Sequence, residues 1–304
     1  MTALVYVVGF CIVAVLVYMA RYSGRLRVTQ SRLIDAPLAE VRGRVIDPSR
    51  WRDWSPWLDG APEIEALRAR DDGRLEQRLR LERPFPFRGR CSWQLSDVQG
   101  RTRVTWSLRG RVAFTMRAFA ATVQGSIALD FRYGLDRLAA LVEPADAPRY
   151  SLSFAGVREV AATRYAYVAH EGPIPGLGNA MASAVGTMRS ELARQGVAAE
   201  GEPIGVYVKT DIKRRITTCR FGIPIGSSEV EGLAVASLPA HRAFVARLQG
   251  SRAQLEVAWY LAMQGLSAEG LQPDLRIAPF ERYLGGANGQ NDNDTVTDLH
   301  IAIR

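Results

Sequence analysis

One carboxylate lies inside an otherwise apolar and aromatic run of the sequence. Residues 277–284 read IAPFERYL, so a tyrosine follows Glu281 two positions later. If the run is a strand, its side chains alternate between faces, and Pro279, Glu281 and Tyr283 lie on one face. A buried carboxylate is costly unless it is protonated or paired, so Glu281 needs a partner within the fold or a cationic ligand. The alternative is a surface edge strand with Glu281 and Arg282 in water.

Other residue types that carry chemistry are few and isolated. Three cysteines and three histidines are spread over the chain, and no two have the close spacing of metal ligands. They are Cys11, Cys91, Cys219, His170, His241 and His300. The sequence therefore predicts neither a disulfide framework nor a metal site, and it indicates no cofactor.

The excess of basic over acidic residues lies in the first half of the chain. Residues 21–150 hold 24 arginines against 16 acidic residues, whereas residues 151–304 hold 15 of each sign, so the whole net charge of +8 belongs to the first half. The arginines are scattered singly among apolar residues without a helix-turn-helix or zinc pattern, which argues against a nucleic-acid partner. Proximity to an anionic membrane surface explains the asymmetry better.

The first twenty residues predict a membrane anchor. Residues 2–20 carry no charge and would span about 28 Å as a helix, close to the thickness of one bilayer core. Neither a preceding basic segment nor a small-residue cleavage site is present, which favours an uncleaved anchor over a signal peptide. A buried core helix is the alternative, and an apolar character all round argues against it. Arginines follow the run, so the positive-inside rule predicts a single-pass protein of the cytoplasmic membrane, with its globular part in the cytoplasm.

The first globular half predicts a strand, a short helix, an antiparallel meander and a long helix. Pro37 is placed to begin the short helix, which ends near residue 47. The long helix, with apolar residues at helical spacing, should lie across the sheet. The predicted strands are residues 27–35, 63–70, 74–82, 89–97 and 101–108, with a turn at residues 99–100 and the long helix at residues 116–143.

Tryptophans recur every three residues in WRDWSPW at residues 51–57, where one helical turn brings them to one side. Together with QGSIALDFRYGLDRLAALVE at residues 124–143, this run resembles the START-like superfamily of polyketide cyclase and ligand-transport domains (SRPBCC) over about residues 25–145. The resemblance implies a helix-grip fold with an apolar cavity for lipid-like ligands, and it names no ligand. Trp54 and Trp57 are candidates for lining this cavity, with core packing as the alternative role.

Beyond a short linker at residues 145–148, the sequence repeats one order of elements: strand, helix, strand, strand. The two copies should pair into one sheet with both helices on one side, which leaves the opposite face to form a cleft. The first copy is residues 161–171, 180–195, 204–209 and 215–224, and the second copy is residues 240–249, 254–265, 275–284 and 295–303.

The second half resembles the GyrI-like domain, the effector-binding domain of AraC-type regulators, over about residues 155–304. The resemblance rests on this duplication, on VAHEGP at residues 168–173 and on PFERYL followed by VTDLHIAI in the second copy. It implies that Glu281 lies at the floor of a small-molecule pocket ringed by aromatic side chains. Some members of the family bind hydrophobic cations, and others hydrolyse strained-ring compounds with the glutamate and a tyrosine.

Superposing the two copies places Gly205 opposite Glu281 and Tyr207 opposite Tyr283, so the glutamate is matched by a residue that leaves room beside it. Four aromatic residues are expected near the carboxylate, although the tryptophan can equally be a core residue of its helix. They are Tyr167, Tyr207, Trp259 and Tyr283. An aromatic pocket with one carboxylate suits a delocalised organic cation, because charge pairing offsets burial and the rings attract the cation.

The sequence therefore predicts an α+β protein with a transmembrane anchor at residues 1–22, a START-like domain at residues 23–148 and a GyrI-like domain at residues 152–304. Three functions stay open. The first is a membrane-anchored, cytoplasm-facing sensor, scavenger or carrier that binds small hydrophobic or cationic ligands through Glu281. The second is a hydrolase with Glu281 and Tyr283 as its catalytic pair. The third is a regulator that acts through a protein partner without binding DNA.

Overall fold

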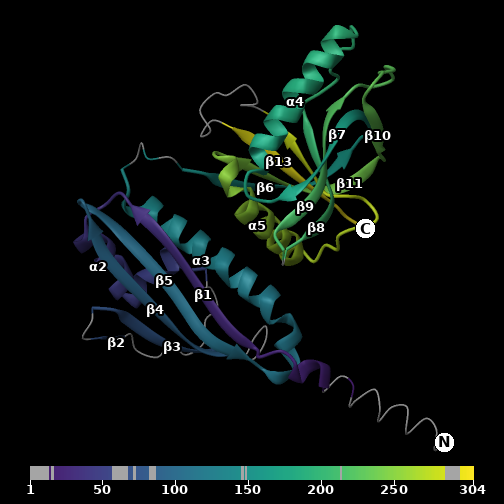
Figure 1. Ribbon diagram of the computed structural model, residues 1–304. Coiled ribbons are helices and arrows are strands. Elements are labelled where there is room, and N and C mark those ends of the chain that lie inside the picture. Colours follow the sequence, from purple (N-terminus) through teal and green to yellow (C-terminus); the bar gives the residue numbers. More distant parts are fainter. Residues whose placement is uncertain are drawn as a thin grey trace, which may run out of the picture. The chain divides into compact units, whose positions relative to one another are not determined.

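The computed structural model divides the chain into two compact units, Met1–Ala147 and Pro148–Arg304 (Figure 1). Each unit is built on its own antiparallel sheet with helices, so the mixed α+β class predicted from the sequence is confirmed. The residues that the structure describes are 14, 17–56, 68–70, 73–81, 87–144, 147, 149–212, 214–284 and 295–304.

The predicted anchor falls mostly outside the described residues, which include only positions 14 and 17–20 of the uncharged run. Within the described part of the chain, no helix is both long enough and apolar enough to cross a membrane. The anchor therefore stays a prediction.

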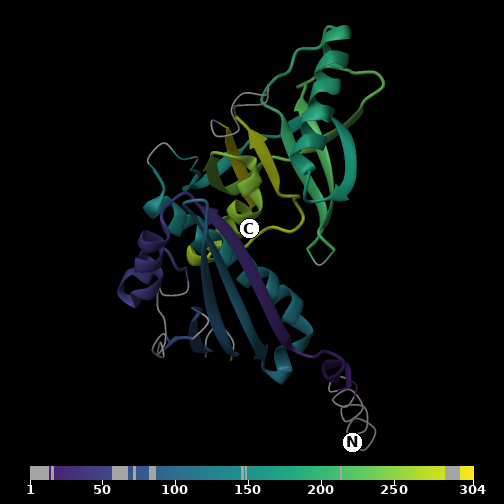
Figure 2. The ribbon, with the colours of Figure 1, turned by 60° about the vertical axis from the view of Figure 1, so that its left-hand side comes forward.

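The first unit is a five-stranded antiparallel sheet with the long helix α3 on one face (Figures 1 and 2). The strands lie in the order β1-β5-β4-β3-β2. Gln99 and Gly100 join β4 to β5 with positive φ angles of 56° and 81°, which confirms the predicted tight turn. The elements are β1 (Arg25–Ile34), α2 (Leu38–Ile46), the 3-10 turn η1 (Pro48–Asp53), β2 (Arg68–Ala69), β3 (Leu75–Leu81), β4 (Phe87–Val98), β5 (Arg101–Val112), the 3-10 turn η2 (Phe114–Phe119) and α3 (Ala120–Val142).

The long helix begins later than the apolar periodicity predicts. Residues 114–119 form the separate turn η2, and α3 starts only at Ala120. Phe119, which fits the periodicity, is 56% exposed instead of facing the sheet. The periodicity holds from Val123 onwards, where apolar side chains three or four residues apart are buried against the sheet.

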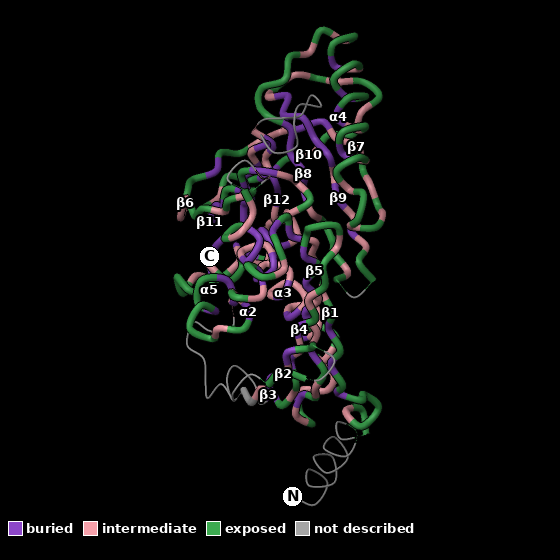
Figure 3. Tube along the Cα trace, turned by 90° about the vertical axis from the view of Figure 1, so that its left-hand side faces the viewer, coloured by how far each residue is buried: buried purple, intermediate pink, exposed green. Residues whose placement is uncertain are grey.

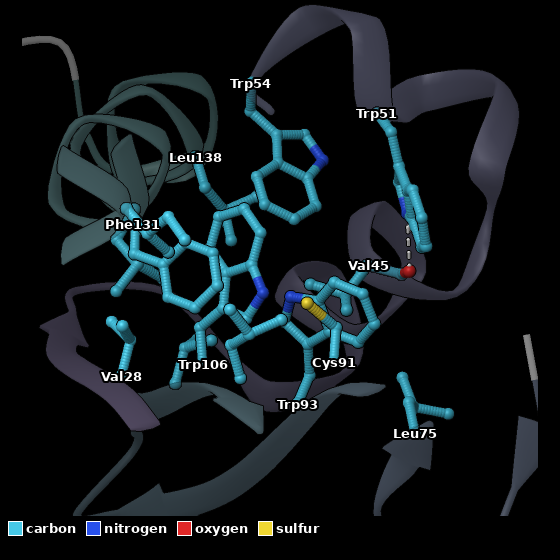
Figure 4. Packing of buried hydrophobic residues seen from close by; sticks show 14 of the residues in the cluster. Val28, Val45, Trp51, Trp54, Leu75, Cys91, Trp93, Trp106, Phe131 and Leu138 are labelled. Carbon is cyan, nitrogen blue, oxygen red and sulfur yellow. Dashed lines mark hydrogen bonds between the residues drawn. The ribbon is translucent and has the colours of Figure 1, made fainter. Parts of the chain in front are cut away.

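An aromatic stack fills the space between the sheet and α3 (Figure 4). The ring of Trp106 on β5 lies parallel to that of Phe131 on α3, with centroids 3.9 Å apart. The ring centroids of Trp93 and Trp106 are 5.6 Å apart, and those of Trp51 and Trp93 are 5.1 Å apart. Gly134 allows the helix to come this close, because a Cβ atom there would be 2.9 Å from the Trp106 ring. Burial of rings of this size is the main stabilising term of the unit.

The second unit is an eight-stranded antiparallel sheet in the order β10-β7-β9-β8-β12-β13-β11-β6. The two predicted strand-helix-strand-strand copies are present as β7-α4-β8-β9 and β11-α5-β12-β13, and they meet where β8 pairs with β12. The elements are β6 (Ser151–Val160), β7 (Thr163–Pro173), α4 (Leu177–Arg194), β8 (Ile204–Asp211), β9 (Ile216–Pro224), β10 (Ala234–Leu238), β11 (His241–Gln249), the 3-10 turn η3 (Arg252–Gln254), α5 (Leu255–Ala268), β12 (Phe280–Tyr283) and β13 (Val296–Ala302).

Two edge strands that the sequence did not predict are exchanged between the copies. Strand β6 precedes the first copy but pairs with β11 of the second copy, and β10 precedes the second copy but pairs with β7 of the first. Each copy therefore supplies the outermost strand of the other, which ties the two halves into one unit.

The exchange also forces the sheet to curl. Only residues 161–162 separate β6 from β7, so the facing ends of these strands lie within about 11 Å, whereas six strand spacings in a flat sheet would separate them by about 29 Å. The cluster inside the curl confirms the consequence, because it joins Val160 and Leu238 from the two edges to Val206 and Phe280 from the middle strands.

Both helices cover the other face of this sheet, as predicted. Helix α4 packs on Phe221 of β9, and α5 packs on Leu299 of β13. The two middle strands, β8 and β12, lie between the strands that the helices cover. Glu281 points to this helix-covered face, because it lies opposite Leu299 in the ladder. Glu281 therefore does not lie on the helix-free face, where the sequence predicts a cleft.

The strand predicted at residues 275–284 is much shorter in the structure, where β12 spans only four residues. Pro279 has no N–H group to donate to a ladder, and Asp274 is instead bonded to the backbone and side chain of Arg276 in a turn. Pro279 still contributes as an acceptor, since its carbonyl oxygen receives the Tyr207 N–H at 2.9 Å.

Candidate functional site

The ladder places Glu281 at the centre of the second unit. Glu281 of β12 lies directly opposite Gly205 of β8, as the superposition of the two copies predicts. Because equivalent residues of the copies meet here, the approximate twofold axis passes between them. Tyr207 and Tyr283 lie two residues further along their own strands, so they flank the axis on the same sheet face instead of pairing directly with each other.

Three neutral donors surround the Glu281 carboxylate. The Trp259 indole N–H donates to Oε1 at 2.6 Å, and the Tyr283 hydroxyl donates to Oε2 at 2.6 Å. The Tyr207 hydroxyl also stabilises the charge of the carboxylate and lowers its pKa, and the Tyr207 ring meets that of Trp259 edge-on with centroids 5.7 Å apart. Glu281 is 0% exposed. The site is thus a closed carboxylate cage, to which β8, α5 and β12 each contribute a ring.

Gly205 makes room for one side of the cage. A Cβ atom at this position would lie 2.4 Å from the Tyr283 hydroxyl oxygen, well inside van der Waals contact. The hydroxyl reaches Glu281 only because residue 205 has no side chain. The room beside the glutamate that the sequence predicts is therefore occupied by the donor itself.

Burial governs the ionisation of the cage. Desolvation raises the pKa of Glu281 above its ordinary value of 4.5, and the hydrogen bonds from Tyr283, Trp259 and Tyr207 oppose that rise. Desolvation, followed by the charge of Glu281, raises the pKa of both tyrosines well above 10, so they act as donors at neutral pH. A carboxyl group in this position binds a proton or a cation more readily than an exposed one does.

Two residues that sequence reasoning missed also belong to this site. The guanidinium of Arg252 lies 5.1 Å from the centre of the Tyr283 ring, and its positive charge has a smaller effect on the pKa of Glu281 than desolvation and the hydrogen bonds have. Cys219 lies opposite Tyr207 in the ladder, and burial, followed by the charge of Glu281, raises the pKa of its thiol to about 12. The alternation of side chains along β9 could have indicated that Cys219 faces the site. The turn capped by Ser251 could have indicated the position of Arg252.

Within the described part of the second unit, the ion pairs involve carboxylates other than Glu281. These carboxylates are Glu159, Glu191, Glu229, Glu256, Asp274 and Asp298. The described residues also contain no group of three histidine, cysteine, aspartate or glutamate side chains that could hold a metal ion.

The structure brings together four of the five residues predicted for this site: Glu281, Tyr283, Tyr207 and Trp259. Tyr167 is not among them. Its strand neighbour Ala166 faces α4, so Tyr167 lies on the helix-free face, where the Arg220 guanidinium is 4.9 Å from its ring centre.

The two cavity candidates of the first unit have different outcomes. Trp54 is fully buried, with its ring edge-on to Trp106 at 5.4 Å, so it is part of the packed aromatic core. Trp57 lies outside the described residues.

Comparison with known solved structures gives matches that cover between 38% and 62% of this chain, and the following three are among them. The EcmrR–DNA complex is 14% identical over 62% of this chain and 68% of its own, with a TM-score of 0.43. The EcmrR C-terminal domain is 16% identical over 51% of this chain and 98% of its own length, with a TM-score of 0.41. SAV2435 bound to tetraphenylphosphonium is 10% identical over 50% of this chain and 94% of its own length, with a TM-score of 0.40. A search of curated proteins finds no match.

Family models match both halves of the chain. Residues 25–143 match the model of polyketide cyclase / dehydrase and lipid transport proteins, and residues 156–304 match the model of the GyrI-like small molecule binding domain. The order of the two matches is the order predicted from the sequence. The chain therefore joins a domain of the polyketide cyclase / dehydrase and lipid transport family to a domain of the GyrI-like small-molecule-binding family.

Proposed function

We propose that the GyrI-like unit binds a hydrophobic organic cation, with Glu281 as its counter-ion and the rings of Tyr207, Trp259 and Tyr283 as its walls. The protein would act as a sensor, scavenger or carrier of such compounds. Residues 2–20 would anchor it in the cytoplasmic membrane, with both globular units in the cytoplasm.

The observation that carries the proposal is a fully buried carboxylate whose described hydrogen-bond partners are neutral donors. Neutral hydrogen bonds only partly offset the cost of removing a carboxylate from water. A cation beside Glu281 would offset more of that cost, and the faces of the rings would add about 0.5 to 2 kcal/mol. The cage therefore favours a ligand that carries charge in a flat, apolar body.

Access to Glu281 requires one of the rings to move. The carboxylate is completely covered, and Trp259 is the only one of its three donors that a helix supplies. We expect ligand entry to displace the indole from Oε1, so that the ligand exchanges one hydrogen bond for a charge contact. Tryptophan fluorescence should report this displacement.

Replacing Glu281 with glutamine tests the proposal. Titration with a tetraarylphosphonium cation should show that Glu281→Gln binds about 5 to 150 times more weakly, equivalent to about 1 to 3 kcal/mol, because the charge contact is lost. A neutral triarylphosphine oxide should bind both forms alike. Asp298→Asn is the matched control, since Asp298 is a buried carboxylate bonded to Arg247 outside the cage. Equal binding of the cation by Glu281→Gln and the parent protein would sink the proposal.

Hydrolysis is a second candidate, favoured by the 2.6 Å hydrogen bond between Tyr283 and a carboxyl group of raised pKa. Glu281 would accept a proton from the attacking water, and a tyrosine hydroxyl would protonate the heteroatom that leaves the strained ring. In that case Glu281→Gln should bind an epoxide or aziridine substrate normally and lose turnover by orders of magnitude. Product analysis of the parent protein decides whether turnover exists at all.

The anchor is tested separately. The full-length protein should sediment with membranes and need detergent for release, whereas a variant without residues 1–22 should stay in solution with its cation affinity unchanged. Full-length protein that is soluble without detergent would overturn the anchor and leave the Glu281 proposal intact.

A further inference from the structure

Arginines form two cross-strand rows on the sheet of the first unit. In the first row Arg25, Arg111 and Arg88 are directly opposite one another on β1, β5 and β4. The second row, two residues further along, continues onto β3. It consists of Arg27, Arg109, Arg90 and Arg78. All seven residues are exposed. We call these seven residues the arginine rows.

The arginine rows lie on the sheet face away from α3. Their strand neighbours Leu26, Val28 and Leu108 are buried in the core beneath α3, so alternation directs the arginines to the other side. A register slip of one residue would bury the rows, so the pairing that builds the core also fixes the charges in line.

Like charges directly opposite each other destabilise a sheet, so the arrangement works against folding. Few carboxylates relieve it. Residues 21–34 and 101–129 contain no aspartate or glutamate, and the carboxylate described beside the rows is Glu76, 3.3 Å from Arg90. Guanidinium groups at this density suit phosphate or carboxylate groups presented by a surface.

The position of the rows in the chain identifies that surface. Arg25 lies five residues after Ala20, the last residue of the uncharged run, and five extended residues span about 17 Å at most. The carbonyl of Gly24 accepts the Val112 N–H at 3.0 Å, so the end of β5 and the following turn η2 lie at the same end of the sheet (Figure 1).

Exposed aromatic residues gather at this end. The exposed fractions are 56% for Phe119, 39% for Phe114, 52% for Tyr18 and 36% for Tyr22. Tyr18 lies within the uncharged run and Tyr22 lies just after it. Figure 3 shows exposed chain where the described residues begin near the N-terminus. Aromatic rings with neighbouring cations are the side chains that settle at the level of lipid headgroups.

We propose that the arginine rows and the η2 phenylalanines form a membrane-docking face that binds anionic lipid headgroups. This inference rests on the anchor proposed above, because an anchored residue 20 holds the rows within reach of the headgroups. Docking would fix the orientation of the first unit on the bilayer, which a flexible tether alone does not do. Nucleic acid offers the same phosphate chemistry, but it would leave the neighbouring exposed rings without a role.

The experiment uses the full chain in lipid nanodiscs, with Cys11→Ala and a single reporter cysteine. The two other cysteines, Cys91 and Cys219, are buried. Thr29→Cys places a fluorophore on the exposed face beside the second row, and Ser183→Cys on the exposed side of α4 is the control position. A quencher on the lipid headgroups measures how close each fluorophore lies to the bilayer, in phosphatidylcholine with and without phosphatidylserine.

Quenching at position 29 should be strong with phosphatidylserine and weak without it, and added salt should reduce it. Arg25→Gln/Arg111→Gln should lower the ratio of docked to undocked protein about 25-fold, since each arginine near an anionic surface contributes about a factor of five. Arg101→Gln/Arg103→Gln removes the same charge from exposed positions at the far end of β5 and should change the ratio little.

Equal quenching in both lipids, or an equal effect of both double variants, would overturn the docking face. A response of the position-29 fluorophore to duplex RNA in neutral nanodiscs, without any response to phosphatidylserine, would assign the rows to nucleic acid and overturn the lipid proposal. Failure of the anchor is seen separately, as protein that does not co-purify with the nanodiscs. Binding of the tetraarylphosphonium cation should be the same in all these variants.

Discussion

Both units bury tryptophan, and Trp54 and Trp93 of the first unit differ from Trp259 of the second in the use of the indole N–H, whereas the Trp51 N–H donates to the Val45 carbonyl at 2.8 Å. In the first unit the Nε1 atoms of Trp54 and Trp93 are buried with no hydrogen-bond partner in the described part of the chain. In the second unit the Trp259 N–H binds a buried carboxylate at 2.6 Å. An unpaired buried N–H costs about 1 to 3 kcal/mol, so at Trp54 and Trp93 the packing of the rings must offset the cost of an unpaired donor.

This difference separates a packing core from a built polar site. The stack around Trp106 is stabilised by the burial and close packing of aromatic rings. This burial contributes more to stability than an unpaired polar atom costs. The cage around Glu281 is stabilised by directional polar interactions, since each ring points its one polar group at the same carboxylate. Perturbing the two sites should therefore change different quantities: stability in the first and ionisation in the second.

The largest effect is expected in the stack. Phe131→Ala should destabilise the first unit by about 3 to 5 kcal/mol, because it removes the ring stacked on Trp106 and leaves a cavity. Urea unfolding followed by tryptophan fluorescence measures the loss, and the cost should not vary with pH. Phe119→Ala, at an exposed position, is the control and should stay within about 0.5 kcal/mol of the parent. Similar losses in the two variants would contradict a core built on this stack.

A backbone position of the cage should show the next largest effect. Gly205→Ala places a methyl group where the Tyr283 hydroxyl lies, so the ring must shift away from Glu281. We expect a stability loss of about 1 to 3 kcal/mol and weaker cation binding by about tenfold. Gly186→Ala on α4, where a Cβ atom meets nothing within 4 Å, should instead stabilise by about 0.5 to 1 kcal/mol. Unchanged cation affinity in Gly205→Ala would show that the Tyr283 hydrogen bond is dispensable.

Trp259→Phe and Trp93→Phe compare the two indoles directly. Trp259→Phe removes a hydrogen bond that lowers the pKa of Glu281, so that pKa should rise further above 4.5. A raised folded-state pKa means stability that is present below pH 4.5 and lost as the pH rises through the folded value. The cost of Trp259→Phe should therefore grow from small near pH 4 to about 1.5 to 3 kcal/mol at pH 7. Trp93→Phe should cost the same at both values, and a pH-dependent cost there would erase the distinction.

The smallest effect is expected for Glu281→Gln in the absence of any cation. Burial raises the pKa of Glu281, so ionisation costs the folded protein stability above pH 4.5, and an amide does not ionise. The hydrogen bonds from Trp259 and Tyr283, together with Tyr207, already offset much of that cost, so we expect the variant to gain less than about 1 kcal/mol at pH 7 and nothing near pH 4. Thermal unfolding at the two pH values measures the gain. A loss at pH 7 would mean that the donors prefer the carboxylate strongly enough to outweigh its burial.

Much of the architecture could be predicted because periodicity and repetition are local signals. The spacing of apolar residues located α3, and the recurrence of GVY as ERY located the twofold axis at Gly205 and Glu281. Strands β6 and β10 escaped prediction because their partners lie in the other copy, so nothing in the neighbouring sequence announces the pairing. Tyr167 was misplaced for a related reason. Both faces of β7 carry apolar side chains, and alternation alone does not say which face meets a helix.

The exchange of edge strands has a consequence for synthesis of the chain. Ser151, near the start of the second unit, pairs with Gln249, so β6 cannot enter the sheet until β11 has been made. At 5 to 20 residues per second, a ribosome takes roughly 5 to 20 seconds to cover that stretch, during which β6 has no native strand beside it. Long-range pairing of this kind slows folding and exposes a strand that can add to another chain. The first unit has one such delay, because β1 pairs with β5, whereas both edge strands of the second unit wait for or serve the other copy, so we expect the second unit to depend more on chaperones during translation.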